Sequence, residues 1–297
     1  MPQIEIGFLC AATNAAWTKY YGAFESALKR TNPNVHITYV SVEADSKGYD
    51  GAARYLAGIK DIKVIVTAGT EAALACKRAA DPTKTAVVFA SAGDPLGCGL
   101  VKSLQHPTGT NVTGCINKQT DEGIVKKRID VMKNKLPPRK NVLVVGNNPP
   151  APGTLCAIDH AMDKALDLLR QARIATATKD KGRWSPSDFL SVDNVKAKLT
   201  PLRDEVDVLW VCSDPVVSAN VNYLIHAARA LGMRTMHEFR EHVDAPNNGH
   251  QCYGPSFQGL FTQAADIVSQ ILSSGLDPGV AASNIDVKPP NAWDEVP

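Results

Sequence analysis

Small polar residues and glycines follow two short apolar runs within residues 61–101 of this sequence. The runs at 62–66 and 85–89 have the composition of buried strands, and an alanine-rich segment lies between them. A turn at the end of such a strand directs backbone N–H groups toward one place, which suits a carboxylate or another small anion. Two of the residues also carry hydroxyl groups that can donate hydrogen bonds. The residues are Gly69, Thr70, Ser91, Gly93 and Asp94.

The same placement recurs elsewhere in the chain. Thr13 and Asn14 follow the first apolar run, and Asn147 ends another in the second half. Asp214 and Glu238 follow two further runs, and their carboxylates could pair with a ligand ammonium group. Hydroxyl donors for a carboxylate and acidic groups for an ammonium together fit an amino acid.

Structural roles are the alternative for each of these residues. Asp94 and Asp214 both precede a proline, so each could instead cap the N-terminus of a helix. Thr70 and Ser91 could cap their own helices, and Gly69 and Gly93 could serve tight turns. Trp17 and Tyr20 have the helical spacing of core residues, and residues 126–140 read as a solvated basic helix face.

Signals for catalysis, metals and cofactors are weak. The sequence lacks a Walker A loop, a GxSxG elbow and an HExxH motif, and apart from His237 and His242 the histidines are isolated. We therefore expect no enzyme activity, no catalytic residue, no metal site and no cofactor. An α/β enzyme would need Asp214 or Glu238 as a general base with a raised pKa. The seven scattered cysteines, without a CxxC pair, are expected to be small buried hydrophobes rather than a disulfide framework.

The order of the apolar runs predicts the architecture. Residues 62–66, 71–80 and 85–89 form a strand, a helix and a strand, a unit whose two strands should be parallel neighbours. The same alternation runs through both halves, so we predict an α/β protein with two doubly wound parallel-sheet lobes. Lobe 1 is predicted to comprise residues 1–113 and 251–297, and lobe 2 residues 114–250. The candidate residues would then lie at the carboxyl edges of the sheets, where α/β proteins bind ligands.

Four segments of the second half carry more specific expectations. Residues 216–231 read as one helix, and 251–255 as a connector between the lobes. Residues 283–287 could add a strand, and the tail beyond them is expected to be loose, with Trp293 packed rather than functional.

Bulk composition narrows the function classes. The chain has 297 residues, 44% hydrophobic and 21% charged, as in ordinary globular proteins, and no apolar segment approaches a membrane span. A net charge of +2 gives no argument for nucleic acid as a partner. The first residues show no export signal. We therefore expect a periplasmic or cell-envelope location if a signal was removed, and a cytoplasmic one if the sequence is complete.

Three segments are distinctive as sequences. They read VIVTAGTEAALACKRA…TAVVFASAGDPLGCGLVKSLQHPTGTNVTG, LWVCSDPVVSANVNYLIHAARALGMRTMHEFREHV and YGPSFQGLFTQAADIVSQIL. The most specific element is AGDP followed by GLVxSLxxPTGTNVTG. Together the segments resemble the substrate-binding components of ABC importers, in the branch whose members bind tryptophan, tyrosine or phenylalanine. The resemblance covers residues 4–287.

The resemblance implies a type I periplasmic-binding-protein fold, in which two lobes joined by three crossings clamp a ligand at a hinge. It implies a small amino-acid-like ligand, aromatic or not, and a membrane permease as partner. Tyr253, at a crossing, is expected to line the cleft. The implied ligand contacts are Thr13, Asn14, Gly69, Thr70, Ser91, Asp94, Asn147, Asp214 and Glu238.

Two function classes therefore stand beside the enzyme. The first is a non-catalytic solute receptor of an ABC importer. The second is a cytoplasmic ligand-sensing module that acts through a partner.

Overall fold

The computed structural model of the chain describes residues 3–10, 15–41, 48–133, 141–147, 156–244 and 247–296. The chain forms two compact units. Unit 1 comprises Met1–Asn117 and Phe257–Asn291, and unit 2 comprises Lys118–Ser256 and Ala292–Pro297. The chain therefore passes between the units three times. These bounds differ from the lobe boundaries drawn from the sequence, because residues 114–117 belong to unit 1 and residues 251–256 and 292–297 belong to unit 2.

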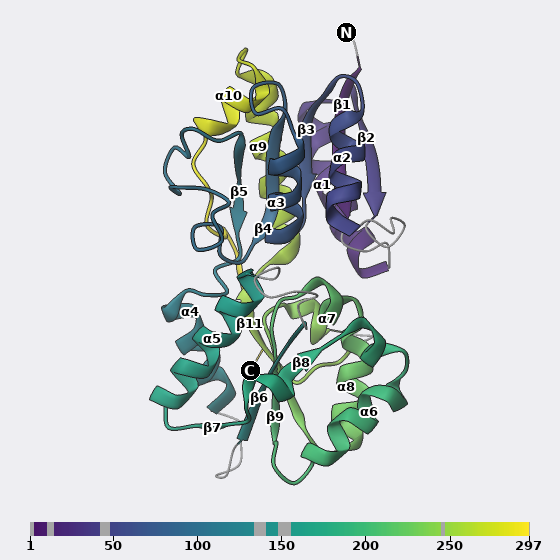
Figure 1. Cartoon of the computed structure of the whole chain (residues 1–297), viewed down its shortest axis with the longest axis vertical. Helices are drawn as coiled ribbons and strands as arrows, with labels where there is room; N and C mark the ends of the chain where they lie inside the picture. Colours follow the sequence, from purple (N-terminus) through teal and green to yellow (C-terminus); the bar gives the residue numbers. More distant parts are fainter. Residues whose placement is uncertain are drawn as a thin grey trace. The chain divides into compact units, whose positions relative to one another are not determined.

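Unit 1 contains a parallel five-stranded sheet in the order β2-β1-β3-β4-β5. Helices α2 and α3 cover one face of the sheet, and α1 and α9 cover the other (Figure 1). The predicted strand–helix–strand unit is confirmed, since β3 and β4 are parallel neighbours joined by α3. The strands are β1 (Ile4–Cys10), β2 (Val35–Ser41), β3 (Ile62–Thr67), β4 (Ala86–Ala92) and β5 (Val112–Ile116); the helices are α1 (Ala15–Thr31), α2 (Gly48–Gly58), α3 (Thr70–Ala79), α9 (Phe257–Ser273) and α10 (Pro278–Ser283).

The α1–α9 face of unit 1 is aromatic. The Phe8 ring of β1 lies 5.2 Å from that of Phe24 on α1 and 6.2 Å from that of Phe261 on α9. Trp17 and Tyr20 join this cluster and are only 6% and 5% exposed. The prediction that the helical spacing of these two residues marks core positions is confirmed.

Unit 2 contains a larger sheet in the order β12-β11-β10-β9-β6-β7, with β8 paired separately to β6. All described pairs are parallel except β11–β12. Helices α4 and α5 supply the core on one face, and α6 and α8 supply it on the other. The strands are β6 (Asn141–Asn147), β7 (Ala175–Thr176), β8 (Arg183–Trp184), β9 (Val208–Val211), β10 (Arg234–His237), β11 (Gln251–Pro255) and β12 (Trp293–Val296); the helices are α4 (Glu122–Lys133), α5 (Cys156–Gln171), α6 (Val192–Leu199), α7 (Pro215–Ala219) and α8 (Val221–Ala230).

The two sheets repeat one strand order. In unit 1 the chain runs from β1 outward to β2 and then crosses to β3, β4 and β5. In unit 2 it runs from β6 outward to β7 and then crosses to β9, β10 and β11. Each sheet therefore has a switch point, between β1 and β3 and between β6 and β9, where helices leave in opposite directions. The predicted class, doubly wound parallel sheets in two parts, is confirmed.

Four segment predictions need correction. The single helix predicted for 216–231 is two helices, α7 and α8, separated at Asn220. The predicted connector 251–255 is the strand β11, because its backbone pairs with β10 and β12. The predicted strand 283–287 does not form, since α10 ends at Ser283 and only Lys288 makes an isolated bridge, to Cys115. The tail is not loose, because Trp293 begins β12.

The cysteine prediction holds for four residues and fails for one. Cys76, Cys115, Cys212 and Cys252 are free and buried, as expected of small apolar side chains. Cys98 is instead part of a disulfide. No described helix combines the length and the apolar character that crossing a bilayer requires.

Candidate functional site

The carboxyl edge of the unit 1 sheet, where the strands end, is built from the turns after β3 and β4. Gly69 has a φ of +91°, a conformation that favours glycine, and it directly precedes the first residue of α3. Its N–H donates to the Ser91 carbonyl oxygen at 2.8 Å. The Thr70 hydroxyl accepts a hydrogen bond from the Gly93 N–H at 3.1 Å. Four of the predicted residues are therefore brought together, and the two turns are tied to each other.

Asn117 completes this edge from the end of β5. Its side-chain amide donates to the Ser91 hydroxyl at 3.1 Å, and its backbone N–H donates to the Ala92 carbonyl at 2.9 Å. Asn117 was not among the predicted residues, although it directly follows a strand just as the other candidates do. The Thr70 and Ser91 side chains are buried, at 1% and 3% exposure. Both hydroxyl oxygens act as acceptors in these bonds, so each hydroxyl keeps its hydrogen for donation.

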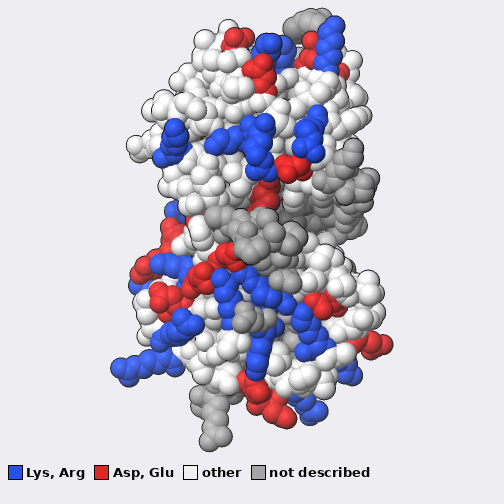
Figure 2. All heavy atoms as spheres, in the orientation of Figure 1, with Lys and Arg blue, Asp and Glu red and all other residues white. Residues whose placement is uncertain are grey.

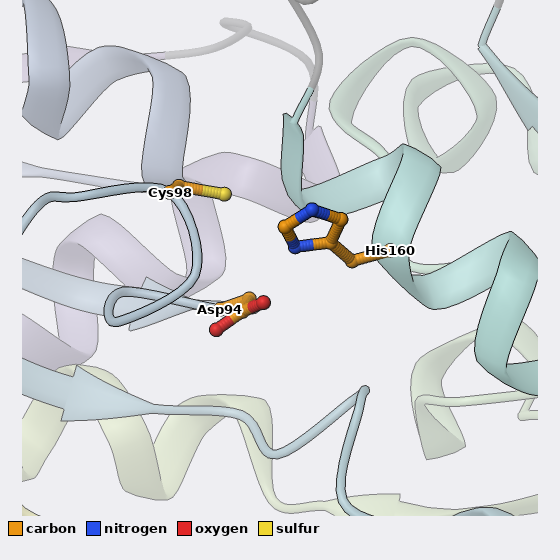
Figure 3. Close-up of side chains that lie close together, drawn as sticks. All are labelled: Asp94, Cys98 and His160. Atoms are coloured by element: carbon orange, nitrogen blue, oxygen red, sulfur yellow. The ribbon is translucent and has the colours of Figure 1, made fainter.

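Asp94 shapes the next turn rather than capping a helix. No helix follows it within the described residues 95–111, so the predicted helix N-cap is wrong. Its carboxylate instead accepts from the Gly97 N–H at 2.9 Å. This is the hydrogen bond that a helix N-cap would make, formed here in an isolated turn. A Cβ on Gly97 would lie 2.2 Å from the Asp94 Oδ2, so a larger residue there would displace the Asp94 carboxylate from this bond. Figure 3 shows Asp94 and Cys98 on this turn segment of unit 1, and His160 on α5 of unit 2.

The carboxyl edge of unit 2 contains a buried ion pair. The Arg128 Nη1 atom on α4 lies 3.0 Å from the Glu238 Oε1 atom, and Arg128 and Glu238 are 0% and 2% exposed. The other oxygen of Glu238 accepts from the Ser213 N–H at 2.8 Å, and the Arg128 Nε–H donates to the Tyr253 carbonyl at 2.8 Å. Burial raises the pKa of the Glu238 carboxyl, and the Arg128 guanidinium opposes that rise. Glu238 thus joins the turns after β9 and β10.

Arg128 is buried, although it was predicted to lie on a solvated helix face. Residues 126–140 were predicted to be a solvated face, and the side chains of Lys126 and Lys127 are indeed exposed, at 56% and 46%. Arg128 points the other way, because it lies three residues after Val125 and four before Met132, on the buried stripe of α4. Its Nη2 atom is buried and has no hydrogen-bond partner among the described residues.

Asp214 caps α7. Its Oδ1 atom accepts from the Val217 N–H at 2.9 Å, and Pro215 takes the first helical position. The capping alternative is therefore confirmed for this residue, and a cap can also contact a ligand. The side chain is only 2% exposed. Asp214 directly follows Ser213, whose amide Glu238 holds, so the two acidic candidates share one turn.

Asn147 ends β6 and is held there by its neighbours. The Arg183 guanidinium on β8 donates to the Asn147 carbonyl at 2.7 Å and forms an ion pair with Asp159. A Cβ on Gly182 would lie 1.8 Å from the Val144 carbonyl, so only glycine allows β8 to approach β6 this closely. The Asn147 Oδ1 atom is buried without a hydrogen-bond partner among the described residues. Arg183 was not predicted from the sequence.

Tyr253 is half-buried against the α4–α5 core of unit 2. Its ring stacks on Trp293 at a centroid distance of 5.7 Å, and the Lys127 Nζ lies 5.7 Å from its centroid. The other two predicted residues, Thr13 and Asn14, lie outside the described residues.

Charges on the outside of unit 2 are intermixed rather than segregated. Basic and acidic side chains lie beside one another on the face of this unit seen in Figure 2. The ion pairs of unit 2 include Lys179–Asp163 at 2.7 Å and Lys164–Glu122 at 3.1 Å. These pairs are open to solvent on at least one side, so each contributes little to stability. The Arg128–Glu238 pair at the carboxyl edge differs from these pairs because both of its side chains are buried.

The two sheets, each with a switch point and polar groups at its carboxyl edge, define a protein of the type 1 periplasmic-binding class. Residues 13–288 match the family model described as ABC transporter substrate binding protein. The match spans most of the sequence, and the chain belongs to this family. The sequence matches no curated protein.

Solved structures of the same fold are distant in sequence. A conserved domain protein from Vibrio cholerae is 23% identical with a TM-score of 0.79, over 99% of this chain and 92% of that chain. An ABC domain from Streptococcus pneumoniae in complex with L-Trp is 17% identical with a TM-score of 0.73, over 99% and 91%. A type 1 periplasmic binding protein from Bordetella pertussis is 14% identical with a TM-score of 0.62, over 95% and 88%. At these identities the likeness concerns the fold.

Proposed function

We propose that this protein is the non-catalytic solute receptor of an ABC importer and that its ligand is a small amino-acid-like molecule. The proposal assigns ligand contacts to the carboxyl edges of both sheets. The observation that carries it is the pair of buried hydroxyls in unit 1. Thr70 and Ser91 each accept a structural hydrogen bond and keep a hydroxyl hydrogen to donate, as a ligand carboxylate requires.

The acceptors of unit 2 supply the complementary half. The buried Asn147 Oδ1 has no partner among the described residues, and a ligand N–H group would satisfy it. Asp214, a buried acidic residue on the turn that Glu238 holds, is the residue whose charge we assign to a ligand ammonium. The family match and the L-Trp complex of the Streptococcus pneumoniae protein support an amino acid as the first class to test.

A thermal-shift screen of refolded, ligand-stripped protein against the common L-amino acids tests this proposal. A ligand at about 100 times its dissociation constant adds roughly 2.7 kcal/mol to the free energy of unfolding. We expect a clear shift with one amino acid or one related group. Absence of a shift with every amino acid would contradict the assigned ligand class.

Asp214→Asn separates the charge of this residue from its capping role. Asparagine is as good an N-cap as aspartate, so the variant keeps α7 while losing the negative charge. We expect the variant to fold and to bind the ammonium-bearing ligand more weakly. Unchanged affinity would remove Asp214 from the ammonium site and leave the receptor assignment standing.

The proposed partner is the membrane permease of the importer, and the proposed location is the periplasm or cell envelope. Fractionation of cells that express the complete gene, with an antibody to this chain, tests the location. Recovery in the cytoplasmic fraction would instead favour a ligand-sensing module that acts through another protein.

A further inference from the structure

The Glu238 carboxylate holds the turn after β9, and Arg128 on α4 in turn holds that carboxylate. Glu238 follows β10 and accepts the Ser213 N–H at 2.8 Å through Oε2. Its other oxygen lies 3.0 Å from the Arg128 Nη1 on α4, 110 residues away in sequence. The adjoining residue, Asp214, is the one to which the proposed function assigns the ligand ammonium. Arg128 therefore touches the proposed binding turn only through Glu238.

This arrangement is costly. Both side chains are almost fully buried, and the Arg128 Nη2 atom has no hydrogen-bond partner among the described residues. Buried ion pairs rarely stabilise a protein more than apolar residues of the same size would, because desolvation offsets the attraction. A buried guanidinium N–H without a partner adds a further penalty. Stability alone therefore gives a poor account of this pair.

We propose that Arg128 is a positioning residue of the unit 2 binding edge: it keeps Glu238 ionised, and the ionised carboxylate holds the Ser213 amide and thereby the Cys212–Asp214 turn. This inference rests on the proposed function. A protonated carboxyl is a weaker acceptor for the Ser213 N–H and offers its own hydrogen instead. The geometry of the turn therefore depends on one proton, and Arg128 excludes that proton.

Arg128 is the group around Glu238 whose positive charge favours the ionised carboxylate. Among the described residues, Arg128 of α4 is the cation beside the carboxylate, while the neutral Trp210 side chain of β9 also favours its ionised form. The Tyr253 carbonyl of β11 engages Arg128 rather than Glu238. From the end of β9 the Cys212 thiol faces it, and burial raises the pKa of that thiol, so it stays neutral. Asp214 acts on the same thiol and would favour protonation of Glu238. Removing Arg128 leaves burial of the carboxylate without an opposing cation.

Three variants separate positioning from simple packing. Arg128→Met removes the charge and keeps an apolar stem; Arg128→Lys keeps a positive charge; Arg128→Met with Glu238→Gln removes the proton site. Lys126→Met, on the exposed face of the same helix, is the matched control. We expect Arg128→Met to lose ligand affinity as pH falls, by up to about tenfold per pH unit for one proton. The wild type, the lysine variant, the double variant and the control should show no such slope.

A ligand-free measurement makes the two proposals separable. In protein with ¹³C-labelled glutamate and ¹⁵N-labelled amides, the Glu238 carboxyl and Ser213 amide signals are followed with pH, assigned by Glu238→Gln. In Arg128→Met we expect both signals to titrate together at a higher pH than in the wild type. An unshifted Glu238 titration, or a Ser213 signal that does not follow it, overturns the inference. If the signals titrate together but no amino acid binds the wild type, the ligand class is wrong and the control of Arg128 over the turn stands.

Discussion

In unit 1 the turns after the two strands beyond the switch point, β3 and β4, are joined by neutral groups. The Thr70 hydroxyl meets the Gly93 N–H, and the Gly69 N–H meets the Ser91 carbonyl. In unit 2 the turns at the same two positions, after β9 and β10, are joined by the Glu238 carboxylate. That carboxylate needs Arg128 from a neighbouring helix. One strand order thus supports two chemistries.

Topology determines the position of the polar groups in both units, but not their charge. Strand order fixes where polar groups collect, because parallel strands end at one edge. Whether that edge is neutral or charged depends on residues from outside the switch point. Asn117 after β5 supplies an amide to unit 1, and Arg128 on α4 supplies a cation to unit 2. The hydroxyl hydrogens of Thr70 and Ser91 suit an anion, and a charged, acceptor-rich edge suits a cation.

Breaking the ion pair should have the largest effect on stability. Arg128→Met leaves Glu238 buried without its cation, which should lower the free energy of unfolding by about 3–5 kcal/mol at neutral pH. Adding Glu238→Gln should recover much of that loss, since no buried charge remains. Urea unfolding of the two variants checks this, and equal destabilisation by both would mean that the pair is held by packing rather than charge.

Acid should weaken unit 2 through its buried histidines. Burial lowers the pKa of His237 and lowers that of His242 to about 4, and their ring centroids lie 5.3 Å apart. Because the folded pKa lies below the unfolded value of about 6.5, stability is complete above pH 6.5 and is lost as pH falls toward 4. For His242 alone the loss reaches about 3 kcal/mol. The two histidines of unit 1, His36 and His106, are exposed.

Unfolding at a series of pH values, with His242→Leu as the comparison, measures that loss. The variant should lose less stability than the wild type between about pH 6.5 and 4, since one group no longer takes up a proton. A variant with the same pH dependence as the wild type would show that the acid effect arises elsewhere.

Removing the Thr70–Gly93 hydrogen bond of unit 1 should lower the free energy of unfolding less than breaking the ion pair does. Thr70→Val removes the acceptor of the buried Gly93 N–H, which should lower stability by about 1–3 kcal/mol. Thr70→Ser keeps the hydroxyl and is the matched control. If the hydroxyl also contacts the ligand, valine should weaken binding and serine should largely preserve it. Calorimetric titration of both variants tests this, and equal affinity of the valine variant and the wild type would leave Thr70 a structural residue.

The smallest effect should come from the aromatic pair at the edge of unit 2. Trp293→Ala removes the stacking on Tyr253 and should cost about 1 kcal/mol, because Trp293 is 36% exposed. Tyr253 packs against Trp293 and Lys127 in the structure, so we expect the ligand affinity of the variant to equal that of the wild type. A large drop in affinity would support the prediction that Tyr253 lines the binding site.

Most of the fold was predictable because its signals are local. Apolar runs, helical spacing and turn residues predicted β1 to β4 and the helices between them. Predictions failed where the partner was distant: β11 ends in Gly254–Pro255, which reads as a turn, but it is a strand because β10 and β12 lie beside it. The break at Asn220 is another case, since the apolar spacing continues through it from α7 into α8.

The candidate site was predictable in position but not in its pairings. Placement after a strand is enough to bring Gly69, Thr70, Ser91 and Gly93 together. It gives no sign that Glu238 is paired, because Arg128 lies on another element and reads as part of a basic surface run. The Arg183–Asp159 pair could not be predicted for the same reason, since its partners lie on different elements. In addition, β8 has only two residues, so no periodicity in the sequence indicates the strand.

In the proposed complex, the Thr70 and Ser91 hydroxyls at the carboxyl edge of unit 1 bind the ligand's carboxylate. Calorimetric titration of ligand-stripped protein with the amino acid that gives the largest thermal shift, and with its carboxamide, tests it most directly. We expect the carboxamide to bind at least about tenfold more weakly, a difference of about 1.4 kcal/mol, and Thr70→Val with Ser91→Ala to reduce that ratio. Equal affinity for the acid and the carboxamide would contradict the claim.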